Sequence, residues 1–115
     1  MPKPVKRFCQ TLALKDNPEL IAQYEACHTP KNIWPEIPGG ICEVGILDME
    51  IYRSGNLLFM IVETPLDFEW ESAMARLATL PRQEEWEKYV SLFQMADADA
   101  TSAGKWQLMD RIFTL

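Results

Sequence analysis

The residue pair best suited to chemistry in this sequence is Tyr24 and His28, which lie four positions apart. His28 is the only histidine in the chain. If residues 18–29 form a helix, side chains four apart share a face, so the phenol and the imidazole point the same way. Leu20 and Cys27 lie on the same stripe, which predicts an imidazole beside apolar surface. Because imidazole gains and loses a proton near neutral pH, the pair indicates general acid–base catalysis.

A second group of suitable residues follows directly in Trp34-Pro35-Glu36, where an indole face, a rigid proline and a carboxylate come together. The chain has four tryptophans, Trp34, Trp70, Trp86 and Trp106. Most are expected in the core or in dimer contacts, and one or two in a pocket. Sugars pack their C–H patches on aromatic faces, while their hydroxyls need placed donors and acceptors. Aromatic surface with one acid–base residue and no cofactor motif favours proton transfer on an uncharged small molecule.

Composition limits the function classes. The net charge of -6 at pH 7 argues against a nucleic-acid binder, which needs a basic surface. No apolar run approaches the roughly 20 residues of a membrane span, and residues 1–7 lack the apolar segment of a signal peptide. The cysteines Cys9, Cys27 and Cys42 lack metal-ligand spacing, which favours reduced thiols in the cytoplasm and no metal or cofactor. A length of 115 residues predicts a single domain, 1–115.

The elements that position these residues begin with a strand over residues 6–14, because apolar and small residues alternate there without a breaker. Asp16 or Asn17 then caps a helix with Pro18 in its first position. That helix is expected to end near His28 or Thr29, since the residue before a proline is pushed towards extended conformations.

The rest of the chain predicts a sheet with covering helices. Pro38-Gly39-Gly40 is interpreted as a break after a short helical turn, and Gly45 as a bulge or bend within the next strand. The predicted elements, in chain order, are a helical turn at 34–37, a strand at 41–52, a hairpin turn at 53–56, a central strand at 57–63, helices at 68–80 and 82–93, a loop at 95–104 and a strand at 106–113.

This order, β-α-β-β-α-(α)-β, predicts a ferredoxin-like α+β fold with helices on one face of an antiparallel sheet. The other face of the sheet then needs cover. Two-fold dimers are the commonest oligomers, so we expect a homodimer that closes this face, as in dimeric α+β barrels.

The sequence resembles the L-rhamnose mutarotase family, enzymes that interconvert the α and β anomers of a sugar. Tyr24, His28 and Trp34-Pro35-Glu36 match the family signature Tyr-x3-His…Trp-Pro-Glu, although two extra residues separate His28 from Trp34. The resemblance runs in order through Lys6-Arg7-Phe8, Asn56-Leu57-Leu58-Phe59, Glu63, Asp67-Phe68, Met74-Ala75, Trp86, Trp106, Met109 and Phe113.

The resemblance implies a dimeric α+β barrel with a sugar pocket in each subunit. It assigns His28 as the catalytic proton donor and Tyr24 as a catalytic and sugar-binding residue. The family also places a tyrosine of the second strand, and a Trp-Trp pair of the last long helix, against the substrate. Here the pair is Trp86-Glu87, and the strand tyrosine falls at Met49. Tyr52 or Glu50 could then supply the missing contact.

The expected function is therefore a sugar mutarotase that acts on a 6-deoxy-L-hexose, with L-fucose the leading candidate and L-rhamnose the next. His28 would open and close the ring by general acid–base catalysis, with Tyr24 holding or relaying the proton. The monosaccharide is the expected partner, without nucleic acid, membrane, metal or cofactor. The expected substrate-binding residues are Tyr24, Trp34, Glu36, Met49, Tyr52, Trp86 and Glu87.

Three other interpretations of the same residues stay open. The chain could be another dimeric α+β barrel, such as a cofactor-free monooxygenase or a haem-handling protein with His28 as axial ligand. It could be a non-catalytic sugar-binding or regulatory module. Finally, His28 could merely cap the first helix of an interaction domain, which a fold without a cavity beside that ring would favour.

Overall fold

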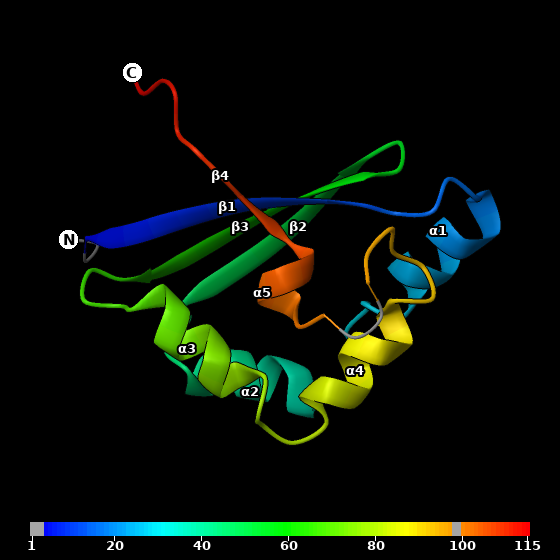
Figure 1. Ribbon diagram of the computed structural model, residues 1–115, viewed down its shortest axis with the longest axis horizontal. Helices are drawn as coiled ribbons and strands as arrows, with labels where there is room; N and C mark the ends of the chain where they lie inside the picture. The colour runs from blue at the N-terminus through cyan, green and yellow to red at the C-terminus, as the bar shows by residue number, and fades with distance from the viewer. Residues whose placement is uncertain (1–3, 98–99) are drawn as a thin grey trace.

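The computed structural model describes residues 4–97 and 100–115 and contains a four-stranded antiparallel sheet in the order β2-β3-β1-β4 (Figure 1). This is the strand order of a ferredoxin-like sheet, so the predicted α+β fold is confirmed. The strands are β1 (Val5–Ala13), β2 (Asp48–Ser54), β3 (Leu57–Pro65) and β4 (Gln107–Met109). The helices are α1 (Pro18–Ala26), α2 (Glu36–Glu43), α3 (Trp70–Leu77), α4 (Gln83–Val90) and α5 (Ser102–Lys105).

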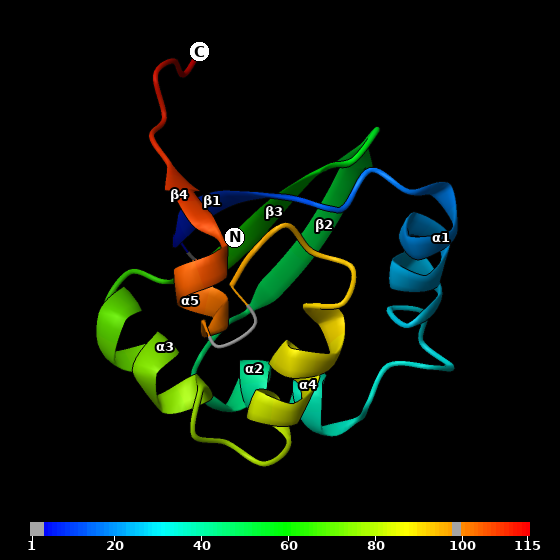
Figure 2. The same ribbon diagram turned by 45° about the vertical axis from the view of Figure 1, so that its right-hand side comes forward.

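The helices lie on one side of the sheet, and the C-terminal residues extend away on the other side (Figures 1 and 2). Alternation along the strands explains the two faces. Gln10, Leu12, Leu58 and Met60 are buried towards the helices. Their neighbours on the opposite face are more exposed, with Phe59 the largest apolar example. Among the described residues, no helix is both long and apolar enough to cross a membrane.

The first strand, the first helix and the hairpin are confirmed. The Oδ1 atom of Asn17 caps α1 by accepting hydrogen bonds from the backbone N–H groups of Glu19 at 3.0 Å and Leu20 at 3.2 Å. Pro18 occupies the first helical position, where its missing N–H needs no partner. The helix ends at Ala26, slightly earlier than expected, and a turn then carries the His28 ring.

The predicted break at Pro38-Gly39-Gly40 is wrong, because α2 runs through it. Pro38 is the third residue of the helix, and the first N–H groups of a helix have no intrahelical acceptor to lose. Gly40 is needed for packing, since a Cβ atom there would lie 3.3 Å from Leu80 Cδ1. Gly45, with φ +102°, marks the turn after α2 rather than a bulge, and β2 starts only at Asp48 instead of residue 41.

The C-terminal half contains shorter elements than predicted. The helices expected at 68–80 and 82–93 are the eight-residue α3 and α4. Within the expected loop 95–104, α5 begins at Ser102, while residues 98 and 99 lie outside the described residues. The strand expected at 106–113 is only the three-residue β4, because its pairing with β1 stops at Cys9.

Candidate active site

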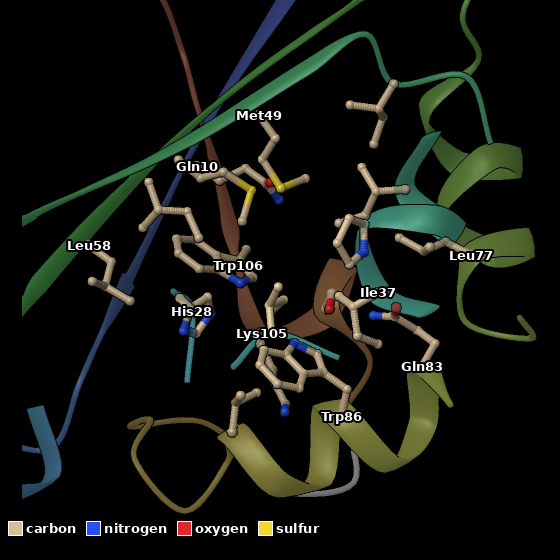
Figure 3. A pocket seen from close by; sticks show the side chains of 18 of the residues that line it. Gln10, His28, Ile37, Met49, Leu58, Leu77, Gln83, Trp86, Lys105 and Trp106 are labelled. Atoms are coloured by element: carbon tan, nitrogen blue, oxygen red, sulfur yellow. The ribbon is translucent and has the colours of Figure 1, made fainter. Parts of the chain in front are cut away.

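A cavity of about 900 Å³ lies between the helix-facing side of the sheet and the helices (Figure 3). Its volume is in the range of pockets that bind small organic ligands. The walls are mostly apolar, with side chains such as Ile37, Met60 and Leu77. Polar side chains interrupt them, among them Gln10, His28, Gln83, Gln94 and Lys105, and the charged residues Glu25, Asp48 and Arg53 also contribute to the lining.

His28 reaches this cavity from the turn after α1. Its Nδ1 atom lies 2.6 Å from the backbone oxygen of Tyr24, four residues earlier. A carbonyl oxygen can only accept, so Nδ1 carries the proton and donates it. The Cys27 thiol donates to the same carbonyl at 3.1 Å. The lone pair of His28 therefore resides on Nε2, the nitrogen that is left for a ligand.

The environment of the His28 ring keeps the ring neutral at pH 7. Burial lowers the pKa of His28 from its ordinary value of 6.5, and the hydrogen bond to the Tyr24 carbonyl opposes this in part. The ring packs against Tyr24 at 4.3 Å between centroids and meets Trp86 nearly edge-on at 5.2 Å. A neutral imidazole with a free Nε2 is suited to accept a proton first and return it afterwards.

Tyr24 supplies a neutral phenol beside this imidazole. Burial raises the pKa of Tyr24 above its usual range, while a hydrogen bond with Gln94 lowers it in part. An amide N–H directed at the phenol oxygen has this effect on the pKa. The phenol proton is then available to another acceptor. Within residues 4–97 and 100–115, Oε1 of Gln94 has no hydrogen-bond partner, although Gln94 is only 3% exposed.

Three more of the predicted site residues line the cavity. Met49 faces it from β2 and Trp86 from α4 (Figure 3). Tyr52 contributes to the lining, but the ladder pairs it with Phe59 on the face away from the helices. Its hydroxyl donates to Oε2 of Glu50 at 2.9 Å instead of serving the cavity.

Trp34 and Glu36 do not line the cavity, contrary to expectation. Trp34 stacks on Tyr89 at 5.7 Å between centroids and meets Trp86 edge-on at 5.2 Å. The Arg82 guanidinium lies 4.0 Å from the Trp34 ring centroid. Its Nη1 atom is 3.6 Å from Oε1 of Glu36. These contacts keep Trp34 and Glu36 at the outer side of α4, where Trp34 supports Trp86 from behind.

Glu87 is also absent from the cavity wall, because its carboxylate is engaged elsewhere. Its Oε1 atom accepts hydrogen bonds from the backbone N–H of Ser102 at 2.8 Å and from Nε2 of Gln83 at 3.2 Å. The Lys105 ammonium donates to the Glu87 backbone oxygen. Glu87 therefore joins α4 to α5.

Comparison with known proteins decides the family. A family model described as L-rhamnose mutarotase matches residues 7–115. The chain belongs to the L-rhamnose mutarotase family. An L-fucose mutarotase from Xanthomonas campestris pv. campestris is 38% identical over 111 residues, which cover 96% of this chain and 89% of that protein.

Two solved structures agree with the fold of this mutarotase. An L-rhamnose mutarotase from Formosa agariphila superposes with a TM-score of 0.71 at 15% identity, covering 96% of this chain and 98% of the other. Tetracenomycin F2 cyclase from Streptomyces glaucescens superposes with a TM-score of 0.57 at 17% identity, covering 96% of both chains. The predicted family, the predicted fold and the predicted enzyme class, a mutarotase that interconverts sugar anomers, are confirmed.

Sequence reasoning missed several polar residues of the mutarotase cavity. Gln10 is a polar residue on the apolar face of a predicted strand, and this misfit was a signal that could have found it. Gln83, Gln94 and Lys105 are buried too, but their surroundings in the sequence give no such signal. The described residues contain no group of three or more His, Cys, Asp or Glu side chains that could hold a metal ion.

Proposed function

We propose that this mutarotase acts on a 6-deoxy-L-hexose, L-fucose first and L-rhamnose next, with His28 as its general acid–base group. The observation that carries the proposal is the placement of His28 on a cavity large enough for a sugar, with Nδ1 engaged and Nε2 free. The choice of sugar is supported by the name of the Xanthomonas relative, an L-fucose mutarotase.

The cavity offers both kinds of surface that such a sugar needs. Ile37 and Leu77 provide apolar wall for the methyl group at C5. Gln10 and Gln94 provide amides for the hydroxyls, and Trp86 provides an aromatic face for the C–H patch.

The reaction needs only proton transfers at two oxygens. Neutral His28 accepts the proton of the anomeric hydroxyl through Nε2 as the C1–O5 bond breaks. O5 gains a proton, supplied by the imidazolium directly or through the Tyr24 hydroxyl, and the open-chain aldehyde forms. Rotation about C1–C2 presents the other aldehyde face, and the reverse transfers close the ring as the second anomer. General acid–base catalysis of this kind contributes about 10²- to 10⁴-fold.

The test is anomer exchange measured by saturation-transfer NMR with L-fucose, L-rhamnose, D-glucose and D-ribose. We expect wild-type exchange to be fastest with L-fucose, and His28→Ala to fall to the buffer rate with its circular dichroism unchanged. Lys31→Ala, an exposed change in the neighbouring turn outside the cavity, is the matched control and should exchange like wild type. Wild-type-like exchange by His28→Ala would refute the role of His28, and faster exchange of D-glucose than of L-fucose would refute the substrate class.

We also propose that the enzyme is a homodimer closed over the open face of the sheet. Phe59 and Leu57 of β3 are exposed on this face, and Met109 of β4, paired with Cys9 of β1, is exposed on it too. Beyond β4, Ile112 and Phe113 are exposed apolar residues. A second copy would cover these side chains in an isologous contact. Light scattering should give twice the chain mass for wild type and a lower mass for Phe59→Glu; a wild-type monomer at micromolar concentration would refute the dimer.

We further infer that the enzyme works in a reducing compartment, the cytoplasm. Cys9, Cys27 and Cys42 are all free thiols in the structure. Free cysteines persist where glutathione keeps thiols reduced. When thiols are alkylated in intact cells and again after the protein is unfolded, all three cysteines should carry the modification. A disulfide in such material would contradict this compartment.

A further inference from the structure

Two indoles line the cavity, and they come from different elements. Trp86 projects from α4, whereas Trp106 lies between α5 and β4. Each is only 6% exposed. In Figure 3 both indoles gather with His28 around the same part of the cavity. Trp106 therefore lies where a sugar held at His28 would meet it.

The indole N–H groups of these two residues are available to a ligand. Within residues 4–97 and 100–115, no protein atom accepts a hydrogen bond from either N–H. Neither of the two nitrogens is completely enclosed by these residues. Buried tryptophans normally find an acceptor for this N–H. Sugar hydroxyls can supply it, while the ring faces pack on C–H patches.

Bonds between the neighbours of the two indoles fix the position of one indole relative to the other. Glu87 follows Trp86 directly, and Lys105 precedes Trp106 directly. The Lys105 ammonium donates to the Glu87 backbone oxygen, and the Glu87 carboxylate accepts from the backbone N–H of Ser102 at 2.8 Å. Glu87 and Lys105 are both only 5% exposed, so water does not compete for these bonds.

We propose that Trp106 is a sugar-binding residue that forms the second aromatic face beside Trp86, and that Glu87 is a positioning residue that holds the segment carrying it. The proposal rests on the proposed sugar substrate. It assigns position 87 a different task from the direct sugar contact that the family resemblance implies. The second indole reaches the cavity from the junction of α5 and β4, and the residue beside the first indole secures α5 in place.

The test measures KM and kcat for L-fucose anomer exchange in wild type, Trp106→Leu, Trp106→Phe and Trp70→Phe. Trp106→Leu should raise KM about five- to tenfold, the size expected for one lost aromatic contact, with a smaller change in kcat. Trp106→Phe keeps an aromatic face and should stay within about threefold of wild type. Trp70 stacks on Phe8 away from the cavity at 4.5 Å, so Trp70→Phe is the control that should leave KM unchanged.

The role of Glu87 is tested by Glu87→Leu, alone and combined with Trp106→Leu. If Glu87 acts by holding Trp106, the single variant raises KM in the same direction, and the double variant is no worse than Trp106→Leu alone. If the KM increases of the two single variants multiply in the double variant, the positioning role is overturned. An unchanged KM in Glu87→Leu would overturn it as well.

The outcomes separate this inference from the proposed function. Unchanged KM in Trp106→Leu, with wild-type exchange intact and lost in His28→Ala, overturns the role of Trp106 and leaves the function standing. If Trp106→Leu does not fold, Trp106→Met, which fills the space with a flexible side chain without a ring, is measured instead. A KM equal to that of wild type overturns the role of Trp106 as an aromatic face, and a KM raised above that of Trp106→Phe supports it.

Discussion

The contact between Tyr24 and Gln94 leads to a stability prediction for Tyr24→Phe. Gln94 lies beside the Tyr24 phenol in a buried place, and its side chain lowers the pKa of Tyr24 in part, as an amide N–H directed at the phenol oxygen would. Phenylalanine keeps the ring contacts with His28 and Phe93 but removes this acceptor. Because the buried Gln94 N–H would then have no partner, the free energy of unfolding should fall by about 1–3 kcal/mol. For a chain of this length that corresponds to a Tm lower by roughly 3–6 °C per kcal/mol.

Gln94 allows the same reasoning to be checked by a double-mutant cycle. Its Oε1 atom already has no partner among the described residues, so the wild-type enzyme bears that desolvation penalty without ligand. Gln94→Met has a similar shape and removes both amide groups. In Tyr24→Phe/Gln94→Met no polar group of the pair is left unpaired, and the double variant should be within about 0.5 kcal/mol of wild type. The coupling free energy between the two sites would then nearly equal the sum of the two single effects, with the opposite sign.

Urea unfolding at pH 7, followed by tryptophan fluorescence and circular dichroism, measures all four proteins of the cycle. Tyr89→Phe is the matched control, because this tyrosine is partly exposed and lies outside the cavity. Its free energy of unfolding should change by less than about 0.5 kcal/mol. Tyr24→Phe as stable as wild type, or a double variant that loses the sum of both single effects, would refute the assigned hydrogen bond.

Two further predictions concern pH and the packing of α2. Burial lowers the pKa of His28, so kcat/KM should fall tenfold per pH unit below a midpoint that lies under 6.5; a midpoint above 6.5 in a pH series would contradict the buried neutral ring. The unfolded chain binds the His28 proton more readily, so this residue's contribution to stability is present above about pH 6.5 and is lost as the pH falls below it. In α2, Gly40→Val should lower the free energy of unfolding by about 1–3 kcal/mol, because Leu80 lies where the new side chain would be. Gly39→Ala has open space around it and should raise that free energy by up to about 1 kcal/mol, both measured by urea unfolding. Equal effects at both glycines would contradict the packing argument.

The parts of the fold that could be predicted from the sequence depend on nearby residues. The cap of α1 needs only Asn17, Pro18 and the N–H groups that follow them. The hairpin needs only Gly55 and its flanking strands. Likewise, the spacing of Tyr24 and His28 on a helix end was sufficient to place the two rings together, because no distant residue has to agree.

The parts that could not be predicted depend on residues far apart in the sequence. Leu80 packs where a side chain at Gly40 would be, and no local rule reports that neighbour. Trp34 carries the family signature, yet the stack on Tyr89 and the guanidinium of Arg82 decide which side of α4 it occupies. Glu87 sits beside the expected sugar-stacking ring, but Ser102 turns its carboxylate towards α5.

The cavity concentrates polar groups that are left without protein partners. Nε2 of His28 is free because Nδ1 is engaged, and Oε1 of Gln94 is free because no described donor reaches it. The N–H groups of Trp86 and Trp106 donate to no described atom. The enclosed Gln94 Oε1 atom lowers the stability of the empty enzyme, and a hydroxyl-bearing ligand can offer partners to all of these groups. Because a sugar offers several donors and acceptors around one small ring, it can satisfy groups from α1, α4 and the α5–β4 junction at once. We therefore expect a polyhydroxylated ring to bind beside the His28 imidazole more favourably than an apolar ligand of equal size.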